Sequence, residues 1–547
     1  MITINNNSII FSKDEKYYEY LRRYLVKIYL IKNTNYFKYT ATRTFTKYNI
    51  PEIDEQVNSL NRQLRQRPFD KGDQFYDVYY IYNLDNDDNL IVPIGLMEFV
   101  KPFFSKYVNI NYNLNDRLID TNKVISSLSD KLLDGITLRE EQMKAIKLCL
   151  TLKRTIIQMG TGAGKSEVMC GFIKSIQNET GECPTTLLLE PTDKLKNEMI
   201  ERFQKYGINA IDYGKKRQII KNAINITHPM SLNNDLEKDK NLLKDIKIYM
   251  CDECHHSSCT SYMTTILNIP SAEYTIGVSA SAVSQEHIGE KNIANYDINE
   301  IETMSMIGTV SMNVTAADLI KGSKLAKPVL LIVNNLANEV LDKKKQNDWH
   351  EINKKKLQSP KRTREIAEMS VFFSKRNRKT LILVNTKDYA YNIAKVINEL
   401  GLNDQCRLSF GGKVFLKYNS TLGEFEKDDS DTFEDYRSGK ISILIGTQHL
   451  VEGVDVPSLD TVILAYCGKS ERIQIQSCGR VLRLTKNGNM AYIVDFSDCK
   501  DPILSYQFKT RLKTYLTTIG VNRNDVYVVN PEKIEEETSI IFNKYEN

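Results

Sequence analysis

The segment that most constrains this chain is a glycine-rich run from Gln158 to Ser166, which reads QMGTGAGKS. It follows the β-branched residues 155–157 and precedes a helical pattern of apolar residues. Such a strand–loop–helix unit directs backbone N–H groups and a positive helix dipole at phosphate oxygens. Lys165 can then reach the β- and γ-phosphates, and the Ser166 hydroxyl can ligate Mg²⁺. The segment predicts ATP and Mg²⁺ as cofactors.

The nucleotide is expected to contact Gly160, Thr161, Gly162, Ala163, Gly164, Lys165 and Ser166. In the strict spacing of a phosphate-binding loop the first glycine would fall at Met159, and Gly160 takes its place one position later. A glycine-rich turn before a helix would not account for Lys165 and Ser166.

The overall charge says little about partners, because 74 basic and 69 acidic residues leave a net charge of only +5 over 547 residues. The ten cysteines show no paired spacing, which is typical of a reducing compartment. There is no signal-peptide pattern at the N-terminus, and no apolar run approaches the roughly 18 residues of a membrane span. We therefore expect a soluble, cytoplasmic protein without a membrane partner.

Strand-like runs alternate with helical patterns twice along the chain, which predicts two parallel sheets covered by helices. The runs of the first half are 155–158, 186–190, 224–227, 246–251 and 274–279. Those of the second half are 329–333, 380–384, 442–445, 462–464 and 491–494. Only the first half carries a phosphate loop. The predicted fold is α/β, with two tandem RecA-like lobes.

The predicted domains are a small α/β N-terminal module over 1–115, a first lobe over 116–325, a second lobe over 326–500 and a helical C-terminal tail over 501–547. In the N-terminal module we expect a strand over 77–82 and a helix over 94–107. The tail should hold a helix over 504–516 followed by a polar, acidic end. Basic and aromatic residues between 17 and 45 form either a nucleic-acid surface or the core and edge of a small sheet.

A second acidic site follows the buried-strand pattern at 246–251. Asp252 would hold the magnesium shell, and Glu253 would polarise the attacking water. The alternative is a zinc site, because five possible ligands lie within nine residues: Cys251, Cys254, His255, His256 and Cys259. Zinc needs four ligands that converge on one point, and Cys251 ends a strand beside the phosphate site. The acid pair is the preferred interpretation.

With the sequence Asp252-Glu253-Cys254-His255, the chain resembles the superfamily 2 helicases of the DExH kind. Motifs similar to those of the family follow in order at 138–142, 189–192, 227–232, 279–281, 381–386, 446–447, 452–457 and 476–483. They span about 345 residues and leave the N-terminal module and the tail uncovered. Ser281 stands where the Ser-Ala-Thr motif of the family has threonine.

The resemblance implies roles for further residues. Arg139 and Gln142 would contact the adenine, while Gly453 and Asp455 would touch the ribose. Gln476, Arg480 and Arg483 would complete the catalytic set beside Lys165, Asp252 and Glu253, with the two arginines reaching the γ-phosphate when the lobes close. The residues implied to contact nucleic acid are Pro191, Thr192, His228, Thr386 and Thr447.

Within the superfamily the chain most resembles the phage UvsW-type recombination helicases, on segments 94–102 and 464–470 and on Asp495. That family remodels branched DNA: it reverses forks, migrates junctions and unwinds R-loops. The resemblance implies a monomeric, virus-encoded DNA motor acting on branched or single-stranded DNA, with replication or recombination proteins as partners. The alternatives are a viral transcript-release or RNA-directed motor, with RNA as partner, and a nucleotide-gated scaffold without turnover.

One segment is strongly basic. Residues 342–379 contain 13 Lys and Arg against 5 Asp and Glu, a net charge of +8. They form either a phosphate-gripping surface, whose contacts would make binding depend on salt, or a solvated helix and loop. Turnover is favoured over a passive scaffold because the catalytic residues are intact: Lys165, Asp252, Glu253, Arg480 and Arg483.

Overall fold

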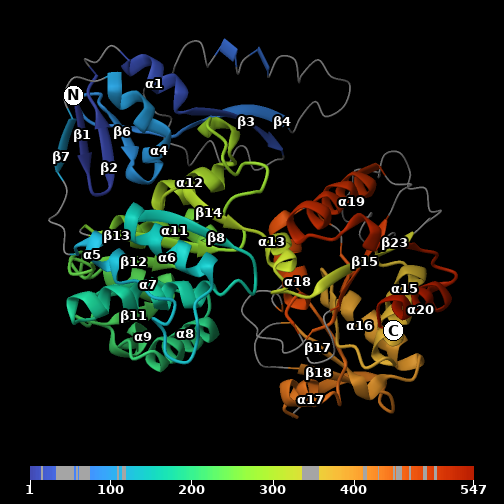
Figure 1. Ribbon diagram of the computed structural model, residues 1–547. Helices are drawn as coiled ribbons and strands as arrows, with labels where there is room; N and C mark the ends of the chain where they lie inside the picture. Colours follow the sequence, from blue (N-terminus) through green and yellow to red (C-terminus); the bar gives the residue numbers. More distant parts are fainter. Residues whose placement is uncertain are drawn as a thin grey trace. The chain divides into compact units, whose positions relative to one another are not determined.

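The computed structural model describes residues 1–13, 17–32, 55–56, 59–60, 74–106, 110–113, 119–270, 272–334, 357–410, 415–428, 430–447, 450, 459–466, 468, 470–484, 490–497 and 502–546 (Figure 1). This part of the chain forms two compact units. The first comprises Met1–Gln158 and Ser166–Asn313. The second comprises Val314–Asn547 together with the short loop Met159–Lys165.

The N-terminal module of the first unit is built on a five-stranded sheet of order β5-β6-β2-β1-β7. Its strands are β1 (Ile2–Asn5), β2 (Ser8–Phe11), β5 (Asn83–Leu84), β6 (Leu90–Pro93) and β7 (Ile110–Asn113). Alternate residues of β1, β2 and β6 are buried, as expected for a sheet with one covered face. Helix α1 (Tyr18–Tyr24) and the antiparallel pair β3 (Val26–Lys32) and β4 (Gln74–Tyr80) complete the module.

The single helix predicted over 94–107 is wrong. The segment contains two 3₁₀ turns, Ile94–Leu96 and Lys101–Lys106, on either side of the one-turn helix α4 (Met97–Val100). Pro102 explains the break, because proline lacks an N–H group and its ring clashes with the carbonyl four residues earlier. The predicted strand over 77–82 is present as β4, which begins and ends earlier.

The sheet of the first lobe has the order β10-β11-β9-β12-β13-β8-β14. Its strands are β8 (Arg154–Met159), β9 (Thr186–Leu189), β10 (Ala210–Asp212), β11 (Ile224–Thr227), β12 (Ile248–Cys251), β13 (Tyr274–Ser279) and β14 (Val310–Val314). Neighbouring strands from β10 to β8 pair in parallel. Because strands β9, β11, β12 and β13 are buried throughout, helices must cover both faces.

The helices of this lobe are α5 (Thr121–Ser126), α6 (Glu140–Leu152), α7 (Lys165–Thr180), α8 (Asp193–Lys205), α9 (Tyr213–Lys216), α10 (Pro229–Leu236), α11 (Thr260–Leu267) and α12 (Ile298–Met306). The N-terminal module packs against this lobe, and one apolar core contains residues of both. Gly95 allows the close approach, since a Cβ there would lie 2.1 Å from the Met304 carbonyl oxygen in α12.

The second unit is organised around a nine-stranded sheet of order β19-β18-β17-β20-β16-β21-β22-β15-β23. Its strands are β15 (Lys327–Asn334), β16 (Thr380–Leu383), β17 (Cys406–Ser409), β18 (Phe415–Asn419), β19 (Glu424–Asp428), β20 (Ile443–Gly446), β21 (Thr461–Leu464), β22 (Met490–Ser497) and β23 (Val526–Val529). Pairing is parallel from β17 to β23, and β18 and β19 add an antiparallel edge.

The helices of the second unit are α13 (Ala316–Lys321), α15 (Pro360–Ser374), α16 (Lys387–Glu399), α17 (Thr432–Ser438), α18 (Glu471–Val481), α19 (Pro502–Thr514) and α20 (Ile534–Glu546). Each run predicted as a strand in the two lobes overlaps a strand of one of the two parallel sheets, with ends that differ by up to three residues. The predicted architecture of two tandem RecA-like lobes is confirmed.

The C-terminal segment contains more than the predicted helix and acidic end, because a strand and a second helix follow that helix. The predicted helix over 504–516 is α19, continued by a π-helical turn over Tyr515–Ile519. After it, β23 pairs in parallel with β15, and α20 buries Ile541 and Phe542 against the second core. The end of the chain is therefore an integral part of the second sheet. Among the residues that the structure describes, no helix is long and apolar enough to cross a membrane.

Candidate active site

Three adjacent strands of the first sheet end at the same edge and carry the predicted catalytic residues. Strand β8 leads into the phosphate loop, β13 into Ser279, and β12 into Asp252 and Glu253. The strands are parallel, so their carboxyl ends meet at one edge. In open α/β sheets ligands bind outside the carboxyl ends of the strands. The fold thus brings residues from distant parts of the sequence to the place where a ligand is expected.

The phosphate loop has the backbone that a cradle for an anion requires. Gly162 and Gly164 adopt φ angles of +82° and +81°, a conformation that side chains other than glycine rarely tolerate. The loop leads into α7, a helix of 16 residues that begins at Lys165. The Lys165 ammonium lies 3.4 Å from the Met159 carbonyl oxygen, so the cation is folded back over its own loop. Glycine conformation, helix terminus and lysine all fit a phosphate chain.

The acid pair after β12 is held in a constrained backbone. Glu253 has φ +45° and ψ +50°, a left-handed conformation that is uncommon for a residue with a side chain. Its N–H donates to the Asp252 carboxylate at 2.8 Å, which fixes the two residues relative to each other. Strained residues of this kind cluster at active sites. The geometry fits the predicted roles in magnesium binding and water activation, which remain predictions.

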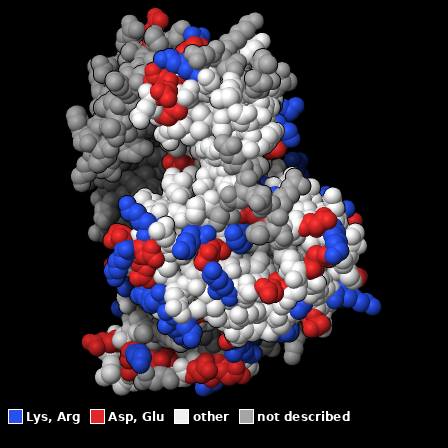
Figure 2. Space-filling model, turned by 90° about the vertical axis from the view of Figure 1, so that its left-hand side faces the viewer, with Lys and Arg blue, Asp and Glu red and all other residues white. Residues whose placement is uncertain are grey.

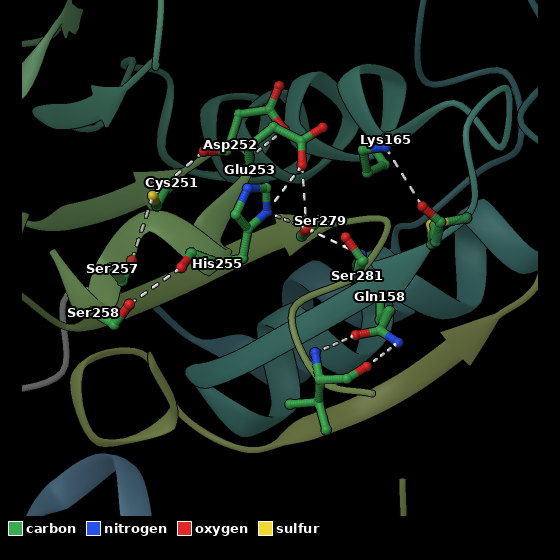
Figure 3. A network of polar contacts seen from close by, with 12 residues as sticks. Gln158, Lys165, Cys251, Asp252, Glu253, His255, Ser257, Ser258, Ser279 and Ser281 are labelled. Carbon is green, nitrogen blue, oxygen red and sulfur yellow. Dashed lines mark hydrogen bonds and ion pairs between the residues drawn. The ribbon is translucent and has the colours of Figure 1, made fainter. Parts of the chain in front are cut away.

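Ser279 at the end of β13 connects the acid pair to the next motif (Figure 3). Its hydroxyl donates to the Glu253 carboxylate at 3.1 Å and lies 3.0 Å from His255 Nδ1. It also accepts the N–H of Ser281 at 3.1 Å. His255 is buried, and its Nδ1 lies 3.3 Å from the same carboxylate oxygen of Glu253. A movement of residues 279–281 would therefore alter the hydrogen bond to the Glu253 carboxylate directly.

The zinc alternative finds no geometric support. Cys251 accepts a weak hydrogen bond from the Ser257 hydroxyl at 3.6 Å, and Cys254 packs under Gly277. Burial raises the pKa of both thiols, whereas zinc requires thiolates. In the described ranges, the group whose ligand atoms come close enough to share a metal lies elsewhere, at His287, Asp297 and Glu300.

Glu190 belongs to the motif at 189–192, but the sequence analysis assigned it no role. It follows β9 at the same edge, is fully buried, and neither carboxylate oxygen has a hydrogen-bond partner among the described residues. Burial, with Asp252 and Glu253 nearby, raises the pKa of this carboxyl well above its ordinary value. The sequence feature that could have identified it is an acidic residue directly after the three leucines that end a buried strand.

Gln158 at the end of β8 was also given no role of its own. Its side-chain amide donates to the Val283 carbonyl and accepts from the Val283 N–H, both at 2.9 Å (Figure 3). This reciprocal pair ties the residue before the phosphate loop to the segment after 279–281. Because a buried glutamine can hydrogen-bond to many different groups, the sequence alone could not identify the Val283 backbone as its partner.

Upstream of the phosphate loop, Arg139 and Gln142 stand at the start of α6. Arg139 is the N-cap residue, and its N–H donates to the Gln142 side-chain oxygen at 2.9 Å. Gln142 is 5% exposed, so this capping interaction fixes its position. The predicted contact of both residues with adenine stays a prediction.

Three of the five predicted nucleic-acid contacts cap helices. The side chains of Thr192, His228 and Thr386 accept backbone N–H groups at the starts of α8, α10 and α16. Each follows the end of a parallel strand, as do Pro191 and Thr447. The capped helix starts thus lie at the carboxyl edges of the two sheets, where a phosphate backbone would meet favourable dipoles.

The arginine-bearing motif of the second unit lies at the end of α18. Gln476 and Arg480 are separated by four residues and so share a helix face, with Gln476 buried. Arg483 lies beyond the end of the helix and is exposed. The predicted ribose contacts Gly453 and Asp455 fall outside the described residues.

The basic segment 342–379 is only partly described, and several of its described cations are structural. Arg362 is fully buried, with its guanidinium 4.4 Å from the centre of the Phe496 ring. Arg376 donates to the Ser539 hydroxyl at 3.0 Å, and buried Arg378 forms an ion pair with Glu546. Both hold α20. A phosphate-gripping role would therefore fall mainly to residues 342–356, which lie outside the described ranges.

Figure 2 shows one face of the molecule, on which Lys and Arg side chains are interspersed with Asp and Glu. No uniform basic field covers that face. This agrees with the small net charge of the chain.

Comparisons with known proteins match both halves of the motor. Residues 135–283 match the family described as type III restriction enzyme, res subunit. Residues 362–485 match the helicase conserved C-terminal domain. The first match contains the phosphate loop, the acid pair and Ser279, and the second contains Gln476, Arg480 and Arg483.

Among curated proteins, the chain is 23% identical over 387 residues to putative helicase 22 of a Sulfolobus islandicus filamentous virus, covering 66% of this chain and 64% of the relative. It is 22% identical over 436 residues to the ATP-dependent DNA helicase uvsW of Enterobacteria phage T4, covering 75% and 80%. The chain thus spans less than two thirds of the viral relative.

Among solved structures, the fragment of a putative HsdR subunit of a type I restriction enzyme from Vibrio vulnificus matches with a TM-score of 0.51 and 16% identity. The match covers 89% of this chain and 84% of the fragment, and it supports the fold. Motif order, both domain matches and these relatives agree. The chain belongs to the superfamily 2 helicases and carries both motor domains of that ATP-hydrolysing family.

Proposed function

We propose that this chain is an ATP-driven motor that remodels branched DNA, by fork reversal, junction migration or R-loop unwinding, in recombination, repair or replication. The observation that carries the motor part is the Ser279 bridge. It joins the segment after β13 to Glu253, the residue best placed to polarise water, through a hydrogen bond of 3.1 Å. A passive nucleotide-gated scaffold would not need such a link.

ATP and Mg²⁺ are the cofactors that the site fits. The phosphate loop and Lys165 would hold the phosphate chain, while Ser166 and Asp252 would hold the ion. Bound Mg²⁺ neutralises charge on the phosphates. Glu253 would orient and deprotonate water, and the hydrogen bond from the Ser279 hydroxyl helps to hold its carboxylate in place.

DNA as the substrate is supported by the relative named as a DNA helicase. Branch recognition is assigned to the N-terminal module because two of its side chains hydrogen-bond to the first lobe after residues 279–281. The Tyr24 hydroxyl donates to the Lys291 carbonyl at 2.9 Å, and the Lys27 ammonium donates to the Ala294 carbonyl at 2.8 Å. Both acceptors belong to the loop that follows 279–281. A junction held by the module would thus be linked to the segment that contacts Glu253.

Removing residues 1–115 would be a poor test, because the module shares an apolar core with the first lobe. Point substitutions are cleaner. Tyr20 is 60% exposed with its ring 5.8 Å from that of Phe103, and exposed Lys101 lies two residues from Phe103. Tyr112, which is 63% exposed on the sheet edge of the same module, serves as the matched control.

The experiment measures ATPase activity with forked DNA, single-stranded DNA and RNA side by side. We expect DNA to stimulate turnover more than RNA, and forks more than single strands. Tyr20→Ser with Lys101→Gln should reduce the fork preference, and Tyr112→Ser should preserve it. Equal or greater stimulation by RNA would overturn the DNA assignment. An unchanged fork preference in the double variant would remove branch recognition from this part of the module.

A further inference from the structure

The second sheet has a cavity of about 560 Å³ at the carboxyl ends of its strands. It is lined by Val384 just after β16, by Lys387 at the start of α16, by Phe410 just after β17, by Thr447 just after β20, and by Gln474 of α18. All of these residues belong to the second unit, so the cavity depends on that unit alone.

Two buried polar groups in the lining lack partners. Gln474 is 1% exposed, and neither its side-chain oxygen nor its side-chain nitrogen has a hydrogen-bond partner within the described residues. The same is true of the Thr447 hydroxyl oxygen, which is also buried. Leaving such groups unpaired lowers the stability of the folded protein. Most buried polar groups are satisfied, and these two residues both line the same cavity, so their unpaired atoms are available to a ligand that enters it.

The remaining lining suggests what that ligand is. Phe410 and the largely buried Tyr466 contribute aromatic rings. Lys387 is exposed, with its ammonium 5.6 Å from the centre of the Phe410 ring. Aromatic side chains stack on nucleobases, and a lysine beside them can meet the neighbouring phosphate. A free anion would instead call for buried cations.

We propose that this cavity receives one unstacked base of the bound nucleic-acid strand and that Gln474 hydrogen-bonds its edge. The proposal rests on the proposed function, since it concerns the strand on which the motor acts. A carboxamide offers one donor and one acceptor side by side, as the edges of bases do. Rotation of the amide exchanges the two positions, so a base of any sequence can be accepted. Gln474 would therefore bind a base of any type and would not contribute to sequence specificity.

The test compares a short single strand with the same strand carrying abasic sites, using the full-length chain. Gln474→Met keeps the length of the side chain and removes both polar atoms. The wild-type protein should bind the base-containing strand more tightly than the abasic one, and the variant should lose about 5- to 150-fold of this preference. Because the unbound protein leaves the amide unpaired, the variant should also melt at the same or a higher temperature.

Gln405→Met is the matched control. The Gln405 side-chain oxygen accepts hydrogen bonds from Ser374 at 2.9 Å and Ser442 at 2.8 Å, so its amide is already used inside the same unit. This variant should lower the melting temperature and retain the preference for base-containing strands.

The outcomes separate this inference from the proposed function. A wild-type protein that binds neither strand, and whose ATPase responds to no nucleic acid, would contradict the function itself. Wild-type binding that is equal for normal and abasic strands would overturn only the base pocket. A lower melting temperature of Gln474→Met with an intact preference would show that the amide has a structural role, and would likewise overturn it.

Discussion

The two parallel sheets bury carboxylates in opposite ways. Glu190 follows β9 in the first sheet, is 0% exposed, and has no hydrogen-bond partner among the described residues. Asp495 lies within β22 of the second sheet and is equally buried. It receives two N–H groups of Arg511, at 2.8 and 3.0 Å, and the Tyr515 hydroxyl at 2.8 Å.

This difference suggests that the unpaired carboxyl of Glu190 serves the active site and that the paired carboxyl of Asp495 serves the fold. A buried acid without a partner lowers stability and is kept where a site uses it, whereas a fully paired acid holds elements together. The Asp495–Arg511 pair fixes α19 to the second sheet. Glu190 lies instead beside the residues expected to bind magnesium. The comparison predicts that substitutions at the first edge change activity, while those at the paired acid change stability.

The largest effect is expected from Arg480→Ala. If Arg480 stabilises charge at the γ-phosphate, as the helicase family implies, DNA-stimulated hydrolysis should fall by about 10³–10⁵-fold. ATP affinity measured without DNA should change little. Arg364→Ala is the control, because Arg364 is an exposed residue of the same unit paired with Glu368 one helical turn away. Normal DNA stimulation in Arg480→Ala would exclude this residue from catalysis.

Glu253→Gln should lower turnover by about 10²–10⁴-fold, the usual contribution of a general base. ATP should remain bound, because the phosphate loop is untouched. Lys165→Ala provides the contrast, since losing the lysine charge should weaken both ATP binding and hydrolysis. Measurements of nucleotide affinity and of turnover for both variants check this. Wild-type turnover in Glu253→Gln would refute the catalytic assignment at the first edge.

Arg511→Met should act on stability. Removing one partner of a buried ion pair leaves the other charge uncompensated, at a cost of about 3–5 kcal/mol. The second unit should lose hydrogen-exchange protection in β22 and α19 first. Arg364→Met should stay within about 0.5 kcal/mol of the wild type, as surface substitutions usually do. Equal stability of the two variants would contradict the division between function and architecture.

Much of the fold could be predicted because its strands are short, apolar and buried on both faces. Residues 186–189 and 248–251 contain no charged side chain and are buried throughout, and a strand of this kind is recognisable without its neighbours. The phosphate loop is equally local, since its glycine conformations and its lysine lie in consecutive residues. Both features depend on sequence neighbours alone.

The helix over 94–107 failed for a local reason, at Pro102, whereas the other errors occurred where residues distant in the sequence determine the structure. Strand β23 is half-exposed along most of its length, so its pattern is weak, and its place was set by pairing with β15, almost 200 residues earlier. The site shows the same limit. Sequence motifs located the acid pair, but whether Gln158, Glu190 and Gln474 have partners depends on elements far along the chain.

Glu190→Gln gives the smallest effect and the most direct test of the comparison. Burial raises the pKa of the Glu190 carboxyl in the folded protein, so the folded state retains a proton that the unfolded state has released. Stability therefore falls as pH rises from the ordinary carboxyl pKa toward the raised one. The glutamine variant lacks this titration. It should match the wild type in acid and exceed it by about 1–3 kcal/mol at neutral pH, the range for an unsatisfied buried polar group. Denaturation of both proteins across a pH series measures the difference, in which all shared titrations cancel. A difference that does not grow as pH rises would contradict the raised pKa of Glu190, and the two sheets would no longer differ in how they bury a carboxyl group.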